Sequence, residues 1–181
     1  MAGLLALVSL AAANAFAEIE HKPLLELARV AVRAEVTGSP APMPETRSAA
    51  LPVFVTIERG GRVLGCRGSL VARSRSLEEE VVLAARAAAA HDPRYRPLTP
   101  TDLGDFQVTV TLVRRLEPIS DSGGLTPSEG LVLTSGDRTG VVLPWEGRDP
   151  KTRLKWAYRK AGVPEGAAAQ LYRLIAERFK G

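Results

Sequence analysis

The sequence predicts an α+β fold, a two-lobed α/β arrangement in which helices pack on mainly antiparallel sheets. Segments with helical periodicity are mixed with pairs of short β-rich segments joined by tight turns, an order typical of hairpins packed with helices. The chain has 181 residues, 45% of them hydrophobic and 24% charged, so one globular domain can bury a sufficient core. We therefore expect residues 18–181 to form a single domain that can divide into two lobes.

The first half of the chain predicts a helix, a long loop and a hairpin. Residues 23–38 repeat apolar side chains on one helical face. Four prolines then mark residues 39–52 as an irregular loop. β-rich segments on either side of a glycine turn at residues 59–62 predict a hairpin, and Cys66 falls near the end of its second strand.

The second half predicts helices around another hairpin. Residues 76–90 give the clearest helix, in which Ser76 and Glu79 are placed as a capping box. Downstream, the patterns predict in turn a strand, a hairpin, a helix and a final amphipathic helix, at residues 106–113, 131–134 with 140–143, 149–162 and 167–180.

The N-terminus has the pattern of a secretory signal peptide. An apolar run from Leu4 to Ala13, too short to span a bilayer, precedes the A-x-A cleavage pattern at residues 15–17. The alternative is an ordinary Ala/Leu-rich first helix, since no Lys or Arg precedes the run. We expect residues 1–17 to be removed and the protein to be periplasmic or secreted, with no integral membrane segment; the alternative location is cytoplasmic.

The composition excludes some kinds of site but does not identify a cofactor. The net charge of +4 permits an acidic partner or an anionic ligand, while 5% aromatic residues leave few platforms for stacking nucleic-acid bases. A lone cysteine excludes an intrachain disulfide. His21 and His91 are far apart and no CxxC or HxxxH spacing occurs, so we expect surface histidines and no metal site.

Four segments in order resemble the AMMECR domain family, named for the AMME syndrome candidate gene product. The resemblance covers residues 24–164, and its segments are VFVTIERGGRVLGCRGS, HDPRYRPLTPTDL, FQVTVTLVRRLEPI and EGLVLTSGDRTGVVLPWEGRDPKTRLKWAYRKAGVP. It implies a larger and a smaller lobe around antiparallel sheets. It also implies an association with a Memo-like protein or a radical-SAM protein, but no established reaction.

The family's signature around the cysteine is close to Leu-Arg-Gly-Cys-Ile-Gly-Thr. This chain keeps the cysteine, both glycines and a hydroxyl at Ser69, but it has Leu64 where the family has arginine and Arg67 where the family has an aliphatic residue. In a regular strand these two positions lie on opposite faces. We therefore expect the positive charge of the motif on the other face of the strand.

Cys66 is the candidate catalytic residue. A catalytic cysteine needs a favoured thiolate with a base or positive charge near it, which Arg67 or a spatially close His91 would supply. The alternative is a small buried side chain, a common fate of free cysteine. Trp145 is expected in the core or at the lobe junction rather than in a ligand platform.

Most of the candidate ligand-binding residues flank Cys66 in the sequence. Gly65 and Gly68 can offer backbone N–H groups as an anion nest, with a bulged strand end as the alternative. The remaining ligand candidates are Arg67, Ser69 and Arg94. Two functions follow: a binding or accessory module for a small anionic or nucleotide-like ligand or a partner enzyme, which we favour, or an enzyme with Cys66-centred chemistry on a base or nucleotide.

Overall fold

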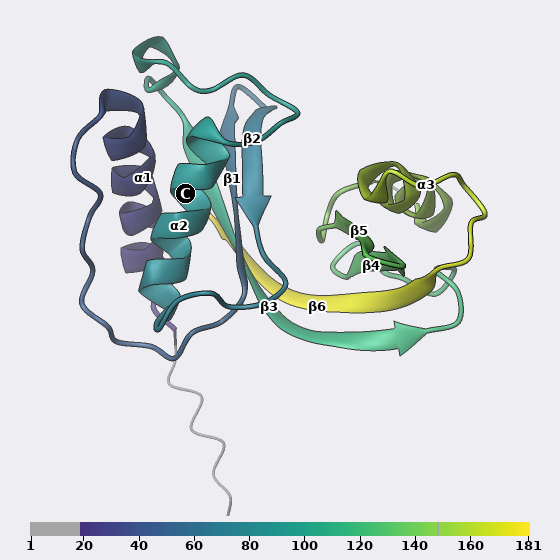
Figure 1. Cartoon of the computed structure of the whole chain (residues 1–181). Coiled ribbons are helices and arrows are strands. Elements are labelled where there is room, and N and C mark those ends of the chain that lie inside the picture. The colour runs from purple at the N-terminus through teal and green to yellow at the C-terminus, as the bar shows by residue number, and fades with distance from the viewer. Residues whose placement is uncertain (1–18, 148) are drawn as a thin grey trace, which may run out of the picture.

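The computed structural model describes residues 19–147 and 149–181, and the predicted signal peptide lies outside this range. The described part folds into three α-helices and one six-stranded, wholly antiparallel sheet, which confirms the predicted α+β class. Figure 1 shows two halves that lie side by side, and the long strands β3 (Gln107–Ile119) and β6 (Gln170–Lys180) run through both of them.

The sheet has the strand order β2-β1-β3-β6-β4-β5, so β2 and β5 are its two edges. Both predicted hairpins are present, as β1 with β2 and β4 with β5. The strands are β1 (Val53–Arg59), β2 (Arg62–Gly68), β3 (Gln107–Ile119), β4 (Gly130–Ser135), β5 (Arg138–Val142) and β6 (Gln170–Lys180).

Capping residues mark several of the helix ends. Gly38 and Gly162 end two of them with positive φ angles of 69° and 68°, and Asp149 accepts a hydrogen bond from the backbone N–H of Thr152. The helices are α1 (His21–Thr37), α2 (Leu77–Ala90) and α3 (Pro150–Ala161), with a 3₁₀ turn at Pro100–Asp102. None of the helices in the described part is long and apolar enough to cross a membrane.

The predicted final helix at 167–180 is wrong, because β6 occupies Gln170–Lys180. Alanine, glutamate and leucine gave this segment helical propensity, but β6 pairs with β3 on one side and β4 on the other. In this central position, the backbone of β6 forms hydrogen bonds with a strand on each side, and Leu174 and Phe179 are buried. These interactions outweigh an intrinsic helical preference of a few tenths of a kcal/mol per residue.

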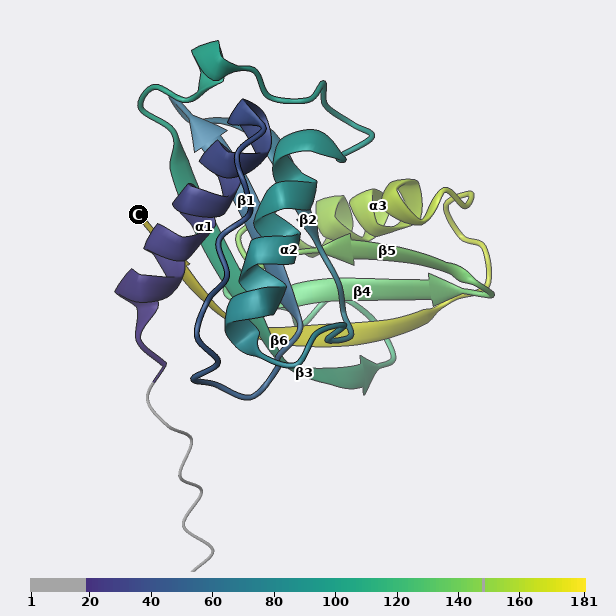
Figure 2. The ribbon, with the colours of Figure 1, turned by 60° about the vertical axis from the view of Figure 1, so that its left-hand side comes forward.

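Two hydrophobic cores lie in the two halves. Val53, Val55 and Ile57 of β1 face α1 and α2 in the larger core, while α3 packs on β4 and β5 in the smaller one. A third cluster joins Phe54 on the opposite face of β1 with Val141 of β5. The sheet is therefore curled, so that its two halves approach each other on the face away from α1 and α2 (Figure 2).

The start of α2 is fixed by Ser76, whose hydroxyl accepts the N–H of Glu79 at 3.2 Å. The predicted capping box is only half formed, because the Glu79 carboxylate accepts the N–H of Arg75 instead of Ser76. We expect Ser76→Ala to lower the free energy of unfolding by about 1 kcal/mol, since one N–H of the first turn loses its acceptor. A urea denaturation midpoint equal to that of the unmodified protein would contradict this role.

Candidate ligand-binding site around Cys66

Close backbone packing shapes β2 around Cys66. Ile57 pairs with Gly65 and Glu58 with Val63, so Leu64 is the extra residue of a β-bulge. A Cβ atom on Gly65 would lie 2.0 Å from the carbonyl oxygen of Ala88 in α2. The glycine therefore allows close contact between helix α2 and strand β2.

The Cys66 thiol points to the face opposite α1 and α2, as does Thr56, its cross-strand partner. Burial raises the pKa of the Cys66 thiol, although the Thr56 hydroxyl donates a hydrogen bond to Sγ at 3.1 Å. The thiol is therefore protonated at neutral pH. In this state it is a poor nucleophile, because the thiolate is the reactive form.

Asp92 and Arg94 hold the backbone of Cys66 from the outer side of the sheet. The Cys66 N–H donates to Asp92 Oδ2 at 2.8 Å, and the Arg94 guanidinium donates to the Cys66 carbonyl at 2.9 Å. Arg94 also forms a two-pronged ion pair with Asp92 at 3.0 and 2.8 Å. The two side chains thus take the place of a neighbouring strand at this edge.

The ion pair fixes the charges of both partners. Burial alone would raise the pKa of Asp92, but hydrogen bonds from Arg94 and from the Cys66 N–H outweigh it and hold that pKa below its ordinary value. The hydrogen bonds to Asp92 raise the pKa of Arg94 further above its usual range. Asp92 is 2% exposed and Arg94 is 44% exposed, so the guanidinium remains reachable from solvent.

The smaller half contributes a second ion pair to this region. Lys160 of α3 donates to Glu146 at 2.6 Å and to the carbonyl of Val141 at 2.8 Å, in the other edge strand of the sheet. The charges of Glu146, Arg94 and Lys160 all act on the Cys66 thiol. An ion pair therefore binds the backbone of each edge strand, β2 and β5, and both pairs carry charges that act on the Cys66 thiol.

Two exposed aromatic side chains flank these ion pairs. Tyr95, next to Arg94, is 38% exposed and lies 5.5 Å from the Arg94 guanidinium, while Trp145, next to Glu146, is 58% exposed. In the described part of the chain, no other aromatic side chain is exposed to this degree. Trp145 was expected in the core or at the lobe junction, and its exposure excludes the core.

Trp145 also has a strained backbone. Its φ angle of 67° is the one positive value at a non-glycine residue in residues 19–147 and 149–181. A bulky side chain with positive φ is unfavourable, and such strain concentrates at ligand-binding positions. A strained and exposed tryptophan marks this loop as a functional candidate that sequence patterns did not reveal.

The strain can be measured with two substitutions that both remove the ring. Trp145→Gly should be more stable than Trp145→Ala by about 1 kcal/mol, because glycine adopts positive φ freely and alanine does not. At most positions an alanine variant is more stable than a glycine variant, so the expected order of stability here is reversed. Urea denaturation of both variants checks it, and an Ala variant at least as stable as the Gly variant would show that the loop is not strained.

The residues predicted to bind a ligand differ in their contacts and exposure. Arg94 contacts the Cys66 backbone, whereas Arg67 is exposed to solvent with no ion-pair partner in the described part of the chain. Ser69 accepts the N–H of Val71 through its hydroxyl. A Cβ on Gly68 would lie 2.1 Å from the Val53 carbonyl, so this glycine, like Gly65, faces neighbouring backbone.

The histidine considered as a base for Cys66 lies elsewhere. The His91 ring is 3.8 Å from Glu35 of α1 and 70% exposed, and its neighbour Asp92 contacts Cys66 instead. Asp92 stands in the HDPRY segment, which the sequence singled out for Arg94. No sequence pattern marked Glu146 and Lys160, because their charges act on Cys66 only in the curled sheet.

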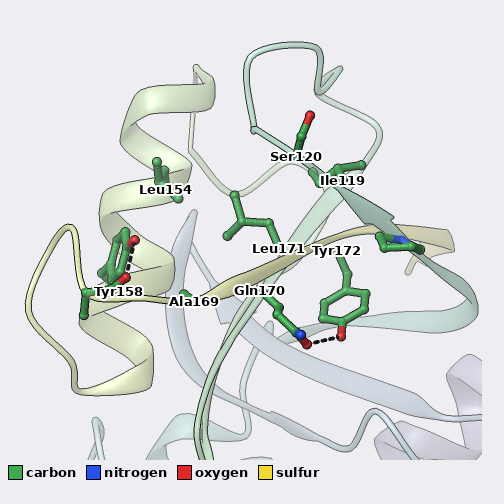
Figure 3. A pocket seen from close by; sticks show the side chains of 10 residues that line it. Ile119, Ser120, Leu154, Tyr158, Ala169, Gln170, Leu171 and Tyr172 are labelled. Carbon is green, nitrogen blue, oxygen red and sulfur yellow. Dashed lines mark hydrogen bonds between the residues drawn. The ribbon is translucent and has the colours of Figure 1, made fainter.

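One hollow lies away from Cys66. It measures about 570 Å³ and is bounded by Leu154 and Tyr158 of α3, by the end of β3 and by the start of β6. Figure 3 shows the Tyr172 hydroxyl directed to Gln170 along its wall. Its lining contains no member of the group around Cys66, and no cluster of three metal-ligating side chains occurs among the residues that the structure describes.

Comparisons with known proteins agree with this architecture. The AMMECR1 family model matches residues 25–181. A protein of Thermotoga maritima is 36% identical over 132 residues, 70% of this chain and 76% of the relative, and one of Methanothermobacter thermautotrophicus is 30% identical over 181 residues, 88% and 93%. The crystal structure of an uncharacterised Pyrococcus horikoshii protein matches with a TM-score of 0.70 and 26% identity, covering 87% of this chain and 89% of that one. The chain therefore belongs to the AMMECR1 family, as the resemblance in its sequence predicted.

Proposed function

We propose that this protein is a non-catalytic module that binds a small anionic, nucleotide-like ligand beside Cys66. The observation that carries the proposal is the pair of exposed aromatic side chains, Tyr95 and Trp145, each next in sequence to a charged residue, Arg94 or Glu146, that acts on the Cys66 thiol. Planar rings of this kind stack on a base, which stabilises binding by about 1–3 kcal/mol per base. The partly exposed Arg94 guanidinium would then bind a phosphate or carboxylate.

The geometry supports binding better than the alternative of Cys66-centred catalysis. A nucleophilic cysteine requires a thiolate, and here burial favours the protonated thiol. The nearest basic side chain, Arg94, already donates to Asp92 and to the backbone carbonyl of Cys66. In this proposal, Cys66 is a closely packed part of the wall of the ligand site, and the ion pairs keep that wall rigid.

The ligand proposal is tested by titration of the whole protein with adenosine monophosphate, followed by calorimetry. We expect saturable binding that is weaker for adenosine, which lacks the charge, and for inorganic phosphate, which lacks the ring. Tyr95→Ala and Trp145→Gly should each reduce the affinity about tenfold, because each removes one stacking surface. The matched control is Tyr172→Ala, at the distant hollow, which should bind as the unmodified protein does. No binding of any nucleoside monophosphate would overturn the proposal.

The role of Cys66 is tested by its reactivity. We expect iodoacetamide to label the native protein only slowly at neutral pH, and fully after unfolding in urea, because the thiol is half-buried and protonated. Arg67→Leu should leave the rate unchanged, since Arg67 alternates with Cys66 along β2 and its side chain is directed to the other face of the sheet. Fast, stoichiometric labelling of the native protein at pH values well below about 8.5, the pKa of a free thiol, would instead support the enzyme hypothesis.

Export and partner choice stay predictions. Cleavage after residue 17 is checked by N-terminal sequencing of protein from its own cells, where an intact Met1 or Ala2 on cytoplasmic material would contradict it. Association with a Memo-like or radical-SAM protein, expected from the family resemblance, is checked by co-purification from the same cells.

A further inference from the structure

The segment from Gly60 to Ser76 contains four arginines and no carboxylate. It comprises the edge strand β2 and the loop that leads to α2. All four side chains, Arg62, Arg67, Arg73 and Arg75, are exposed, and none forms an ion pair in the described part of the chain. By contrast, the nearby arginines Arg59, Arg86 and Arg94 all pair with carboxylates.

The carboxylates closest to this segment bind its backbone and not its guanidinium groups. Glu80, 1% exposed, accepts the N–H groups of Arg73 and Ser74. Glu79 accepts the N–H of Arg75 at 3.0 Å. The loop is thus fixed in place while its guanidinium groups stay in solvent, and a surface ordered before binding loses less entropy when a partner arrives.

We propose that Arg67, Arg73 and Arg75, which we call the arginine rim, form a docking surface for an acidic segment of a partner protein. Guanidinium groups bind carboxylates in a two-pronged geometry, and three unpaired ones concentrate that capacity in nine residues of chain. Val71, 69% exposed between them, adds an apolar contact suited to a protein surface. The segment has no aromatic side chain for stacking bases, which favours an acidic protein over single-stranded nucleic acid.

The inference goes beyond the ligand site and is tested independently of it. The probe is a fluorescein-labelled decaglutamate peptide, whose binding to the whole protein is followed by anisotropy. We expect binding that weakens as NaCl rises from about 50 to about 300 mM, because exposed charges are screened. The triple variant Arg67→Ser, Arg73→Ser and Arg75→Ser should lose on the order of tenfold in affinity, since each exposed pair contributes modestly.

A second triple variant controls for net charge. Lys22→Ser, Lys151→Ser and Arg178→Ser remove the same charge from exposed positions away from the rim, and the affinity should stay within about twofold of the unmodified protein. Equal losses in both triple variants would overturn the proposal, as would absence of binding or tighter binding of oligothymidylate that is lost in the rim variant. Thermal unfolding confirms that both variants are folded. Trp145→Gly should still bind decaglutamate as the unmodified protein does, which separates this proposal from that of the ligand site.

Discussion

Replacing Gly65 by alanine is expected to destabilise the protein by roughly 3 kcal/mol, because the new Cβ would overlap the backbone of α2. The Cβ would lie 2.0 Å from the carbonyl oxygen of Ala88, far inside the distance that real atoms allow. The obstructing atom belongs to a helix backbone and cannot swing away like a side-chain tip. Either α2 moves off the sheet or β2 bends outward, and both separate the core residues between them. Urea denaturation measures the loss.

Gly140 provides a second instance and Gly124 a control. A Cβ on Gly140 would lie 1.9 Å from the carbonyl oxygen of Ala157, so Gly140→Ala should displace α3 from β5 as Gly65→Ala displaces α2 from β2. Gly124 has open space around it, and Gly124→Ala should stay within about 1 kcal/mol of the unmodified protein. Equal stability of Gly65→Ala and Gly124→Ala would refute the close packing of α2 on β2.

Asp92→Asn is expected to lower the free energy of unfolding by about 2 kcal/mol and to loosen the edge of the sheet at Cys66. Removing one partner of a fully buried ion pair costs about 3–5 kcal/mol, and the partial exposure of Arg94 reduces that figure. The asparagine retains a carbonyl for the Cys66 N–H but offers no charge to the guanidinium. Asp105→Asn, at an exposed carboxylate, is the matched control and should leave stability nearly unchanged.

The same pair predicts a pH dependence with a defined sign. The pKa of Asp92 is lowered in the folded protein, so its stabilising effect is complete above the unfolded value of about 3.9 and is lost as the pH falls through the lower folded value. The stability difference between the unmodified protein and Asp92→Asn should therefore shrink as the pH falls from about 5 to about 2. A difference that stays constant over this range would show that Asp92 does not act through its charge. Iodoacetamide labelling should be faster in Asp92→Asn, because the thiol becomes more accessible as the strand edge frays.

Local sequence signals determined most of the elements of this protein. Apolar periodicity and Gly38 define α1, the glycine turns define both hairpins, and Asp149 followed by Pro150 starts α3. These signals are short-range, because capping and turn formation depend on residues within a few positions of each other. The HDPRY segment and the motif around Cys66 are brought together in the structure, where Arg94 donates to the Cys66 carbonyl.

Tertiary structure alone decided the rest. The segment at 170–180 has a helical composition but becomes β6, because pairing with β3 and β4 on both sides outweighs its intrinsic propensity. The charges of Glu146 and Lys160 act on Cys66 from the smaller half because the sheet curls, and no sequence pattern records an interaction across that curl. The protonated thiol and the strain at Trp145 likewise follow from burial and from loop closure. Both properties belong to the folded chain, since each depends on groups far apart in the sequence.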